Sequence, residues 1–431
     1  MRPEAPYARV AHGPPDAYKR GMRAALYWLW ARRPPWPVAA LAGTAGFYAL
    51  FGSPTPDVLG PKEAILALGL LLAVGPAGAR AAIAPLPDEP RPAPLWLGAG
   101  RALLLYGLGA GLLMAVFCAN APVPMVRDVV AFCLLLLPVF FLTHASAAPT
   151  AAWPWIAGAA CVVGLVFAMR TLGLAPGLAA SHLFYLANAP TVLFTALLLG
   201  ATGARLLFCA GGPWALLLAS ALLLAALLPA AAIAVNLQRA SVGALLAVGF
   251  LVAVAQGLAR PRRLLVVALV LALAAAALLP LALRVLAELT QKTQEVGLNN
   301  RGEELAAVWE AIAAHPATLL FGMGWGGMFQ DPAVGGVSVN FTHALLSSAL
   351  LKLGLVGLAL VALYIGALAA VLARMAPRAP GLALALAAPL LIDTFLYAAY
   401  KSFDFGLVLT LIPLSAAYVS TNRARAPGGG P

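Results

Sequence analysis

Two arginines and one histidine have side chains suited to chemistry on a phosphorylated substrate. Arg239 lies in the segment VNLQRASVG, Arg301 opens RGEELAAVW, and His343 lies in FTHALLSS. Arginine is always charged and binds phosphate in a bidentate way, and histidine exchanges a proton near neutral pH. A lone histidine is more often structural than catalytic. His343 is a candidate because of its position, at the end of a long loop where an apolar helix is predicted to begin.

Arg301 occupies the position where a helix is predicted to begin. Asn300 suits the N-cap, and Glu303 completes a capping box three residues later. The apolar residues that follow have helical spacing: Leu305, Val308, Trp309 and Ile312. His315-Pro316 ends this helix. A cation at the first helical position opposes the helix dipole but suits a bound phosphate. The alternative is a local ion pair with Glu303 or Glu304.

Two further cations are candidates for additional phosphate or lipid contacts. Arg170 lies in AMRTLG, and Lys401 lies in YKSFDF. An arginine near a helix end also snorkels to lipid head groups, and this is the alternative interpretation for Arg170 and Arg239.

The sequence predicts no metal site and no cofactor. Asp57, Asp128, Asp331 and Asp404 are isolated along the chain, and the four cysteines lack the spacing of metal ligands. Any phosphate bound on this side would therefore be held by arginines rather than by a divalent metal.

The composition predicts that these residues belong to an all-α, polytopic membrane protein. The chain is 63% hydrophobic and 10% charged, with a mean hydropathy of +0.93. Backbone groups in lipid must be satisfied internally, and long Leu- and Ala-rich runs without alternation favour helices over barrel strands. The net charge of +12 is explained by membrane topology rather than by nucleic-acid binding.

Apolar stretches near the length of a membrane span predict about twelve transmembrane helices. We expect them at 36–52, 63–84, 94–117, 129–147, 153–170, 187–209, 213–234, 241–259, 263–285, 343–373, 380–399 and 404–421. This division leaves a basic N-terminal segment (1–35), helices 1–9 (36–285), one large loop (286–342), helices 10–12 (343–421) and a disordered tail (422–431).

The distribution of Lys and Arg predicts that both termini are cytoplasmic. With that orientation, 18 of the 27 cations lie inside and nine lie outside, as the positive-inside rule requires. The nine outside are Lys62, Arg127, Arg170, Arg239, Arg284, Lys292, Arg301, Lys352 and Lys401.

The large loop is predicted to be structured, because long loops in compact proteins are usually functional. Its later part reads ATLLFGMGWGGMFQDPAVGGVSVNFTH. The run GMGWGG lacks the Gly-Lys-Ser/Thr of a phosphate loop, so we expect its glycines to serve backbone shape and close packing.

Taken in order, QRASVGALLA, RGEELAAVW, GMGWGG and FTHALLSSALLKLGLVGL resemble the O-antigen ligase and polymerase family. The resemblance covers about residues 236–357 and includes the Gly-x-x-Gly of Gly354 and Gly357. The chain has Gln238-Arg239-Ala240 where Ser-Arg-Gly is commoner, and Ala344 where Asn commonly follows the histidine.

The resemblance implies a GT-C-like membrane glycosyltransferase of the inner membrane, with its site facing the periplasm. It implies metal-independent, inverting transfer of a polysaccharide from an undecaprenyl-diphosphate carrier to lipid A-core oligosaccharide. Arg239 and Arg301 match the arginines that hold the donor diphosphate, and His343 matches the essential histidine.

Several alternatives stay open. Within the family these are an O-antigen polymerase and a protein O-oligosaccharyltransferase. A twelve-helix transporter is possible on layout, but no internal repeat is visible and Asp393 is the one clear acidic residue within a predicted span. An intramembrane protease using Ser347 or Ser348 with His343 lacks a nucleophile motif.

Overall fold

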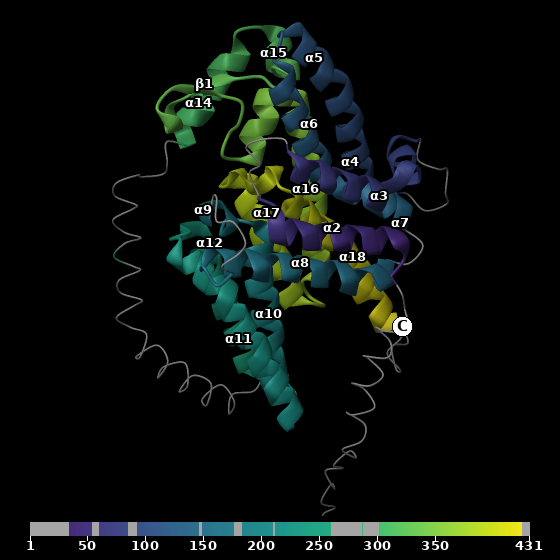
Figure 1. Cartoon of the computed structure of the whole chain (residues 1–431), viewed down its shortest axis with the longest axis vertical. Coiled ribbons are helices and arrows are strands. Elements are labelled where there is room, and N and C mark those ends of the chain that lie inside the picture. The colour runs from purple at the N-terminus through teal and green to yellow at the C-terminus, as the bar shows by residue number, and fades with distance from the viewer. Residues whose placement is uncertain are drawn as a thin grey trace, which may run out of the picture.

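The computed structural model describes residues 34–53, 60–84, 93–145, 149–175, 183–209, 212–259, 287 and 301–424. Helices dominate these ranges (Figure 1). The first part of the chain forms α2 (Trp36–Phe51), α3 (Pro61–Ile83), α4 (Leu95–Tyr106), the π-helix η1 (Gly107–Gly111), α5 (Leu112–Phe117), α6 (Pro122–Leu135), α7 (Leu137–Ala145), α8 (Pro149–Thr171), α9 (Leu183–Leu186), α10 (Pro190–Cys209), α11 (Pro213–Val235) and α12 (Arg239–Ala259). The C-terminal part forms α14 (Arg301–Ala313), α15 (Pro316–Phe321), β1 (Phe329–Asp331), η2 (Pro332–Val334), β2 (Val337–Val339), α16 (Leu345–Met375), α17 (Pro380–Phe395), η3 (Ala398–Lys401) and α18 (Phe403–Ala424).

Within the described ranges, seven helical stretches are long and apolar enough to cross a membrane. They are Pro61–Ile83, Leu95–Phe117, Thr150–Thr171, Pro190–Phe208, Pro213–Val235, Leu345–Met375 and Phe403–Asn422. Three shorter apolar helices accompany them: Trp36–Phe51, Arg239–Ala255 and Pro380–Phe395. The predicted helical class is therefore confirmed, and the seven apolar helices are consistent with a membrane protein, while the count of twelve spans and their orientation stay predictions.

Three predicted spans differ from the helices observed. The predicted span 129–147 is two helices, α6 and α7, separated at Leu136. The predicted span 187–209 begins at Pro190, after the single turn of α9. The predicted span 380–399 ends at Phe395 and is followed by η3. Proline is favoured in the first helical turn, which accounts for the observed starts at Pro122 and Pro190.

Several predictions fall wholly or mostly on residues outside the described ranges. They are the N-terminal segment 1–35, the ninth span 263–285, Asn300 as an N-cap, and the tail 422–431 beyond the end of α18. Of the predicted loop 286–342, residues 301–342 are described as a continuous stretch.

That stretch folds as a small unit at one end of the molecule (Figure 1). It contains the predicted helix α14, the short helix α15, and a two-stranded antiparallel hairpin that pairs Phe329 with Val339. An apolar cluster of Val308, Ile312, Phe329, Leu350 and Leu351 fastens this unit to α16. The hairpin is the one departure from an all-α fold among the described residues.

The glycine-rich run after α15 packs against two membrane helices. Gly322, Gly324 and Gly326 all have positive φ, a conformation that side chains with a Cβ rarely adopt. A Cβ at Gly324 would overlap the backbone of Ala115 in α5. Trp325 is thereby inserted beside η1, where its Nε1 donates a hydrogen bond to the Gly107 carbonyl at 2.7 Å. The prediction that these glycines serve backbone shape and close packing is confirmed.

The same glycine-rich turn packs against a kink in α16. Gly354 has φ of 65° within the helix. The amides of Met323 and Gly324 donate to the carbonyls of Leu351 and Lys352, at 2.8 and 3.0 Å. These carbonyls would otherwise lack partners at a break in the helical ladder, so the glycine turn and the kink stabilise each other.

Candidate functional site

His343 lies in the extended segment that leads from the hairpin into α16. The helix begins at Leu345, because Ala344 has extended backbone angles of φ −129° and ψ 148°. His343 therefore lies before the helix, not in its first turn as the predicted span 343–373 has it, and it does not share a helix face with Ser347. The Ser347 hydroxyl instead donates to the Ala344 carbonyl at 3.1 Å, and this geometry gives no support to a serine protease.

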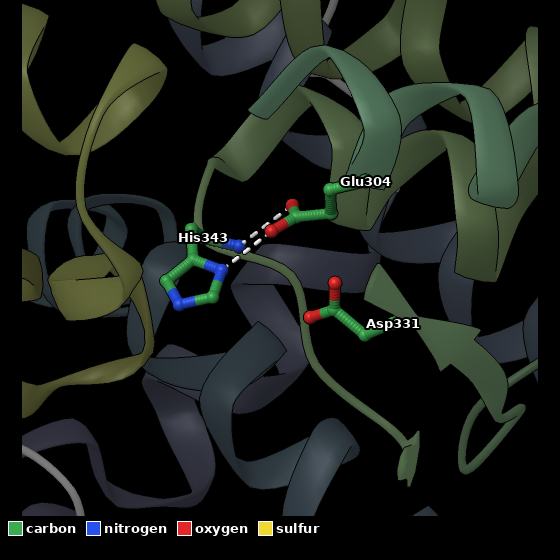
Figure 2. Close-up of side chains that lie close together, drawn as sticks. All are labelled: Glu304, Asp331 and His343. Atoms are coloured by element: carbon green, nitrogen blue, oxygen red, sulfur yellow. Dashed lines mark hydrogen bonds and ion pairs between the residues drawn. The ribbon is translucent and has the colours of Figure 1, made fainter. Parts of the chain in front are cut away.

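Glu304 holds His343 by two hydrogen bonds (Figure 2). The His343 backbone amide donates to Glu304 Oε1 at 3.0 Å, and His343 Nδ1 lies 2.5 Å from Glu304 Oε2. The histidine side chain is 29% exposed, whereas that of Glu304 is 3% exposed. The helix that carries Arg301 thus also fixes the orientation of the imidazole.

The carboxylate of Glu304 stays ionised in this buried place. Burial acts to raise the pKa of Glu304, but the hydrogen bonds from His343 and the charge of Arg301 outweigh it and hold the pKa below its ordinary value. Both oxygens therefore act as hydrogen-bond acceptors.

Asp331, at the end of β1, completes a group of three. One ligand atom each from Glu304, Asp331 and His343 lies within 4.8 Å of the others, and Asp331 is fully buried. Its Oδ1 accepts from the Ala333 amide at 2.8 Å. The prediction that Asp331 is isolated is wrong, because the hairpin packs β1 against α14.

Two other aspartates predicted to be isolated also have partners. Asp128 pairs with Lys352 at 2.7 Å, and Asp404 accepts from the Tyr48 hydroxyl at 2.9 Å. These residues are far apart along the chain, so their pairing depends on helix packing.

Arg301 and Arg239 come together although 62 positions separate them. Arg239 is the first residue of α12, and Arg301 is the first described residue of α14. Burial lowers the pKa of Arg301, and the nearby charge of Arg239 lowers it further, while Glu304 and Asp331 oppose this. One Arg301 nitrogen, Nη1, is buried without a hydrogen-bond partner among the described residues. Two neighbouring guanidinium groups, one of them at the N-terminus of α12, make a region of positive potential suited to an anion.

Tyr397 is a third side chain near the two arginines. It lies just after α17, hydrogen-bonds with the backbone of Ala240, and interacts electrostatically with both Arg239 and Arg301. It therefore ties the start of α12 to the end of α17 beside the arginine pair.

Lys401 is linked to His343 through the ring of Phe341. Its Nζ sits 4.6 Å from the centre of the Phe341 ring, and that ring contacts the His343 imidazole edge-on, with 5.9 Å between centroids. Burial lowers the pKa of Lys401 to about 7. A predicted lipid or phosphate contact is compatible with this place, and it stays a prediction.

Arg170 has a different environment. It is buried, and its Nη1 donates to the carbonyls of Ala49 and Gly52 at 3.0 and 2.9 Å. These carbonyls belong to the C-terminal end of α2, where a cation is favourable. The geometry supports a structural role for Arg170, and its predicted phosphate contact has no support in these bonds.

Sequence reasoning missed Glu304, Asp331 and Tyr397 as members of the site. A signal for Glu304 was present, since it precedes the buried residues Val308 and Ile312 by four and eight positions. Leu305 and Trp309, predicted on the apolar face, are about half exposed at 50% and 47%. The buried stripe of α14 is therefore rotated from the predicted one, and it begins with a carboxylate.

No protein-family model matches this chain. A search of curated proteins likewise finds no significant match.

Proposed function

We propose that the protein is an O-antigen ligase-type glycosyltransferase, which transfers a glycan from an undecaprenyl-diphosphate carrier to a hydroxyl of lipid A-core oligosaccharide. The observation that carries this proposal is the convergence of Arg239, Arg301 and His343 from three separate elements. An anion site next to an oriented imidazole is what transfer from a diphosphate requires.

The arginine pair would hold the donor diphosphate. Two guanidinium groups within electrostatic range of each other repel, and the charge of Arg239 adds to the effect of burial in lowering the pKa of Arg301. A bound diphosphate would relieve that repulsion, and it would offer oxygens to the buried Nη1 of Arg301. As the glycosidic bond breaks, negative charge grows on the leaving phosphate, and the same groups would stabilise it.

His343 would accept the proton of the acceptor. The acceptor oxygen attacks the anomeric carbon from the face opposite the diphosphate, and its proton passes to the imidazole. The bond from the anomeric carbon to the phosphate oxygen breaks, and the electron pair leaves with the diphosphate. One displacement of this kind inverts the anomeric centre and needs no metal.

The same donor chemistry is compatible with two related enzymes. An O-antigen polymerase would extend a lipid-linked chain, and a protein O-oligosaccharyltransferase would modify a protein hydroxyl. We favour the ligase because a single large loop precedes the histidine, and we place the site on the periplasmic face of the inner membrane.

A transporter is the alternative from another class. Asp393 is buried in α17, and both its oxygens lack a partner among the described residues. Intramembrane acids of this kind often mark an ion path. Substrate flux into proteoliposomes without glycan transfer would favour this alternative.

The test is a transfer assay with purified protein in lipid vesicles. The donor is a fluorescent polyprenyl-diphosphate-linked glycan, the acceptor is lipid A-core, and product is resolved on a gel. We expect His343→Ala to lower turnover about 10²–10⁴-fold. The matched control is His315→Ala, because His315 is exposed in the same loop. Wild-type turnover in a folded His343→Ala protein would refute the assignment of the base.

A second measurement separates ligase from polymerase. The gene is deleted in its host and lipopolysaccharide is examined on gels. Loss of a ligase leaves bare core while polymerised glycan accumulates on its carrier. Core that carries a single repeat unit would instead identify a polymerase.

A further inference from the structure

Glu304 is the best-connected side chain of the site, and the proposed reaction gives it no direct part. It lies one turn after Arg301 on α14. Both of its oxygens are occupied by His343, one by the backbone amide and one by Nδ1. An ionised carboxylate has no proton to give, so the hydrogen in the bond at 2.5 Å belongs to Nδ1.

We infer that Glu304 is a positioning residue that holds His343 in the Nδ1–H tautomer and thereby leaves the Nε2 lone pair to receive the proton of the acceptor. Figure 2 shows that the second ring nitrogen points away from both carboxylates. Among the described residues it has no hydrogen-bond partner, and the imidazole is the exposed member of the pair. This inference rests on the proposed function for its kinetic consequence, but not for the tautomer itself.

The backbone bond strengthens this inference. A carboxylate that bonded only to the imidazole could move with the ring when the histidine changes rotamer, so it would not fix the direction of the ring. Because Glu304 Oε1 also accepts from the His343 amide, the main chain and the ring are fixed to the same group. The first turn of α14 therefore sets the place of Arg301 and the direction of the imidazole together. Donor and base would keep a constant separation whatever glycan is carried.

A divalent cation held by Glu304, Asp331 and His343 is the competing explanation for the same geometry. Two features oppose it. Adjacent ligand atoms held at about 2.1 Å from one metal lie about 3 Å or more apart, whereas His343 Nδ1 and Glu304 Oε2 are only 2.5 Å apart. The charge of Arg301 also interacts with both carboxylates, and it would repel a second cation. The buried Oδ2 of Asp331, which has no partner among the described residues, then balances Arg301 through space.

Glu304→Gln tests the inference sharply, because the amide can satisfy the same contacts only with the wrong tautomer. The oxygen of the new side-chain amide would still accept the hydrogen bond from the His343 backbone amide, and its NH2 group would donate to Nδ1. The ring proton would then sit on Nε2, the atom that must accept the proton of the acceptor hydroxyl. We expect turnover to fall on the order of 10²-fold with little change in the donor KM. Glu303→Gln is the control, since Glu303 is exposed on the same turn, and it should keep wild-type turnover.

The tautomer is read directly by nitrogen-15 NMR of histidine-labelled protein in nanodiscs at mildly alkaline pH, with the His343 signal identified by its absence in His343→Ala. The proton is expected on Nδ1 in the wild type and on Nε2 in Glu304→Gln. A ring proton found on Nε2 in the wild type overturns the inference. This result does not depend on whether the protein transfers glycan. Binding of Mn²⁺ alone, measured by electron paramagnetic resonance and abolished by Asp331→Asn, would also overturn it in favour of a metal site.

Discussion

Lys352 of α16 forms an ion pair with Asp128 of α6, with 2.7 Å between Nζ and Oδ2. Lys352 is 2% exposed and Asp128 is 11% exposed. The lysine also donates to the Gly327 carbonyl at 2.6 Å, and Asp128 accepts from the Gly326 amide at 2.8 Å. The pair therefore joins two helices to the glycine turn, and Asp128 also accepts from Asn340 Nδ2 at 3.4 Å, in the segment that leads to His343.

Removing one partner of this pair should destabilise the protein strongly. Lys352→Met leaves the Asp128 carboxylate buried without a counter-ion, and such a change costs about 3–5 kcal/mol. The double variant Lys352→Met with Asp128→Asn removes both charges while an amide oxygen still accepts from Gly326. We expect a large fall in Tm in detergent for the single variant and a substantial recovery for the double. Equal Tm values for the two variants would show that the charges are not coupled.

Gly324→Ala should prevent the glycine turn from docking. Its φ is 75°, and a Cβ there would overlap the backbone of Ala115, which cannot rotate away as a side chain can. The expected result is a lower Tm and loss of transfer together, because the turn also supports the kink at Gly354. Gly366→Ala is the control. Gly366 lies within α16 with open space around its Cβ position, where alanine should be neutral or stabilising by about 0.5–1 kcal/mol. A stable, active Gly324→Ala protein would contradict the close approach.

Composition and periodicity were enough to predict the mostly helical class, the helix α14 and the role of the GMGWGG glycines. They were not enough to find Glu304 or Asp331. Helical spacing locates an apolar stripe only to within one residue. The predicted buried face of α14 included Leu305, whereas the observed one is shifted by one residue and includes Glu304. Asp331 entered the site through the β1–β2 hairpin, whose short strands give little period-two signal. Contacts of that kind depend on tertiary packing rather than on local sequence.

Arg301→Ala should weaken donor use rather than acceptor use. Hydrogen bonds to charged groups are worth about 1.5–3 kcal/mol, so we expect kcat/KM for the lipid-linked donor to fall about 10–100-fold. Arg301→Lys keeps the charge but loses the bidentate geometry, and it should give an intermediate loss. The assay varies donor and acceptor separately in vesicles. A variant that raises only the acceptor KM would place the donor diphosphate elsewhere.

Arg170→Met should affect stability and leave the chemistry intact. The side chain donates to the carbonyls of Ala49 and Gly52, and its loss leaves the end of α2 without that partner. We expect a lower Tm, and an unchanged donor KM for the fraction of protein that is folded. Arg205→Met offers a comparison on α10, where no such capping bonds occur within the described residues. A raised donor KM with normal Tm would instead support the phosphate contact predicted from the sequence.

Lys401→Met should stabilise the protein in a pH-dependent way. Burial lowers the pKa of Lys401 to about 7 in the folded state, whereas an unfolded lysine titrates near about 10.4. Below pH 7 the folded protein must carry a buried charge, so the destabilisation by Lys401 is fully present there. It declines as the pH rises from about 7 to about 10.4, where the unfolded chain also loses its proton.

We therefore expect the gain in Tm from Lys401→Met to be largest near pH 6 and to shrink toward pH 9. The exposed Lys62 provides the control, and Lys62→Met should show no such trend. A gain at Lys401 that is the same at both pH values would show that the ammonium group is well solvated in the folded state.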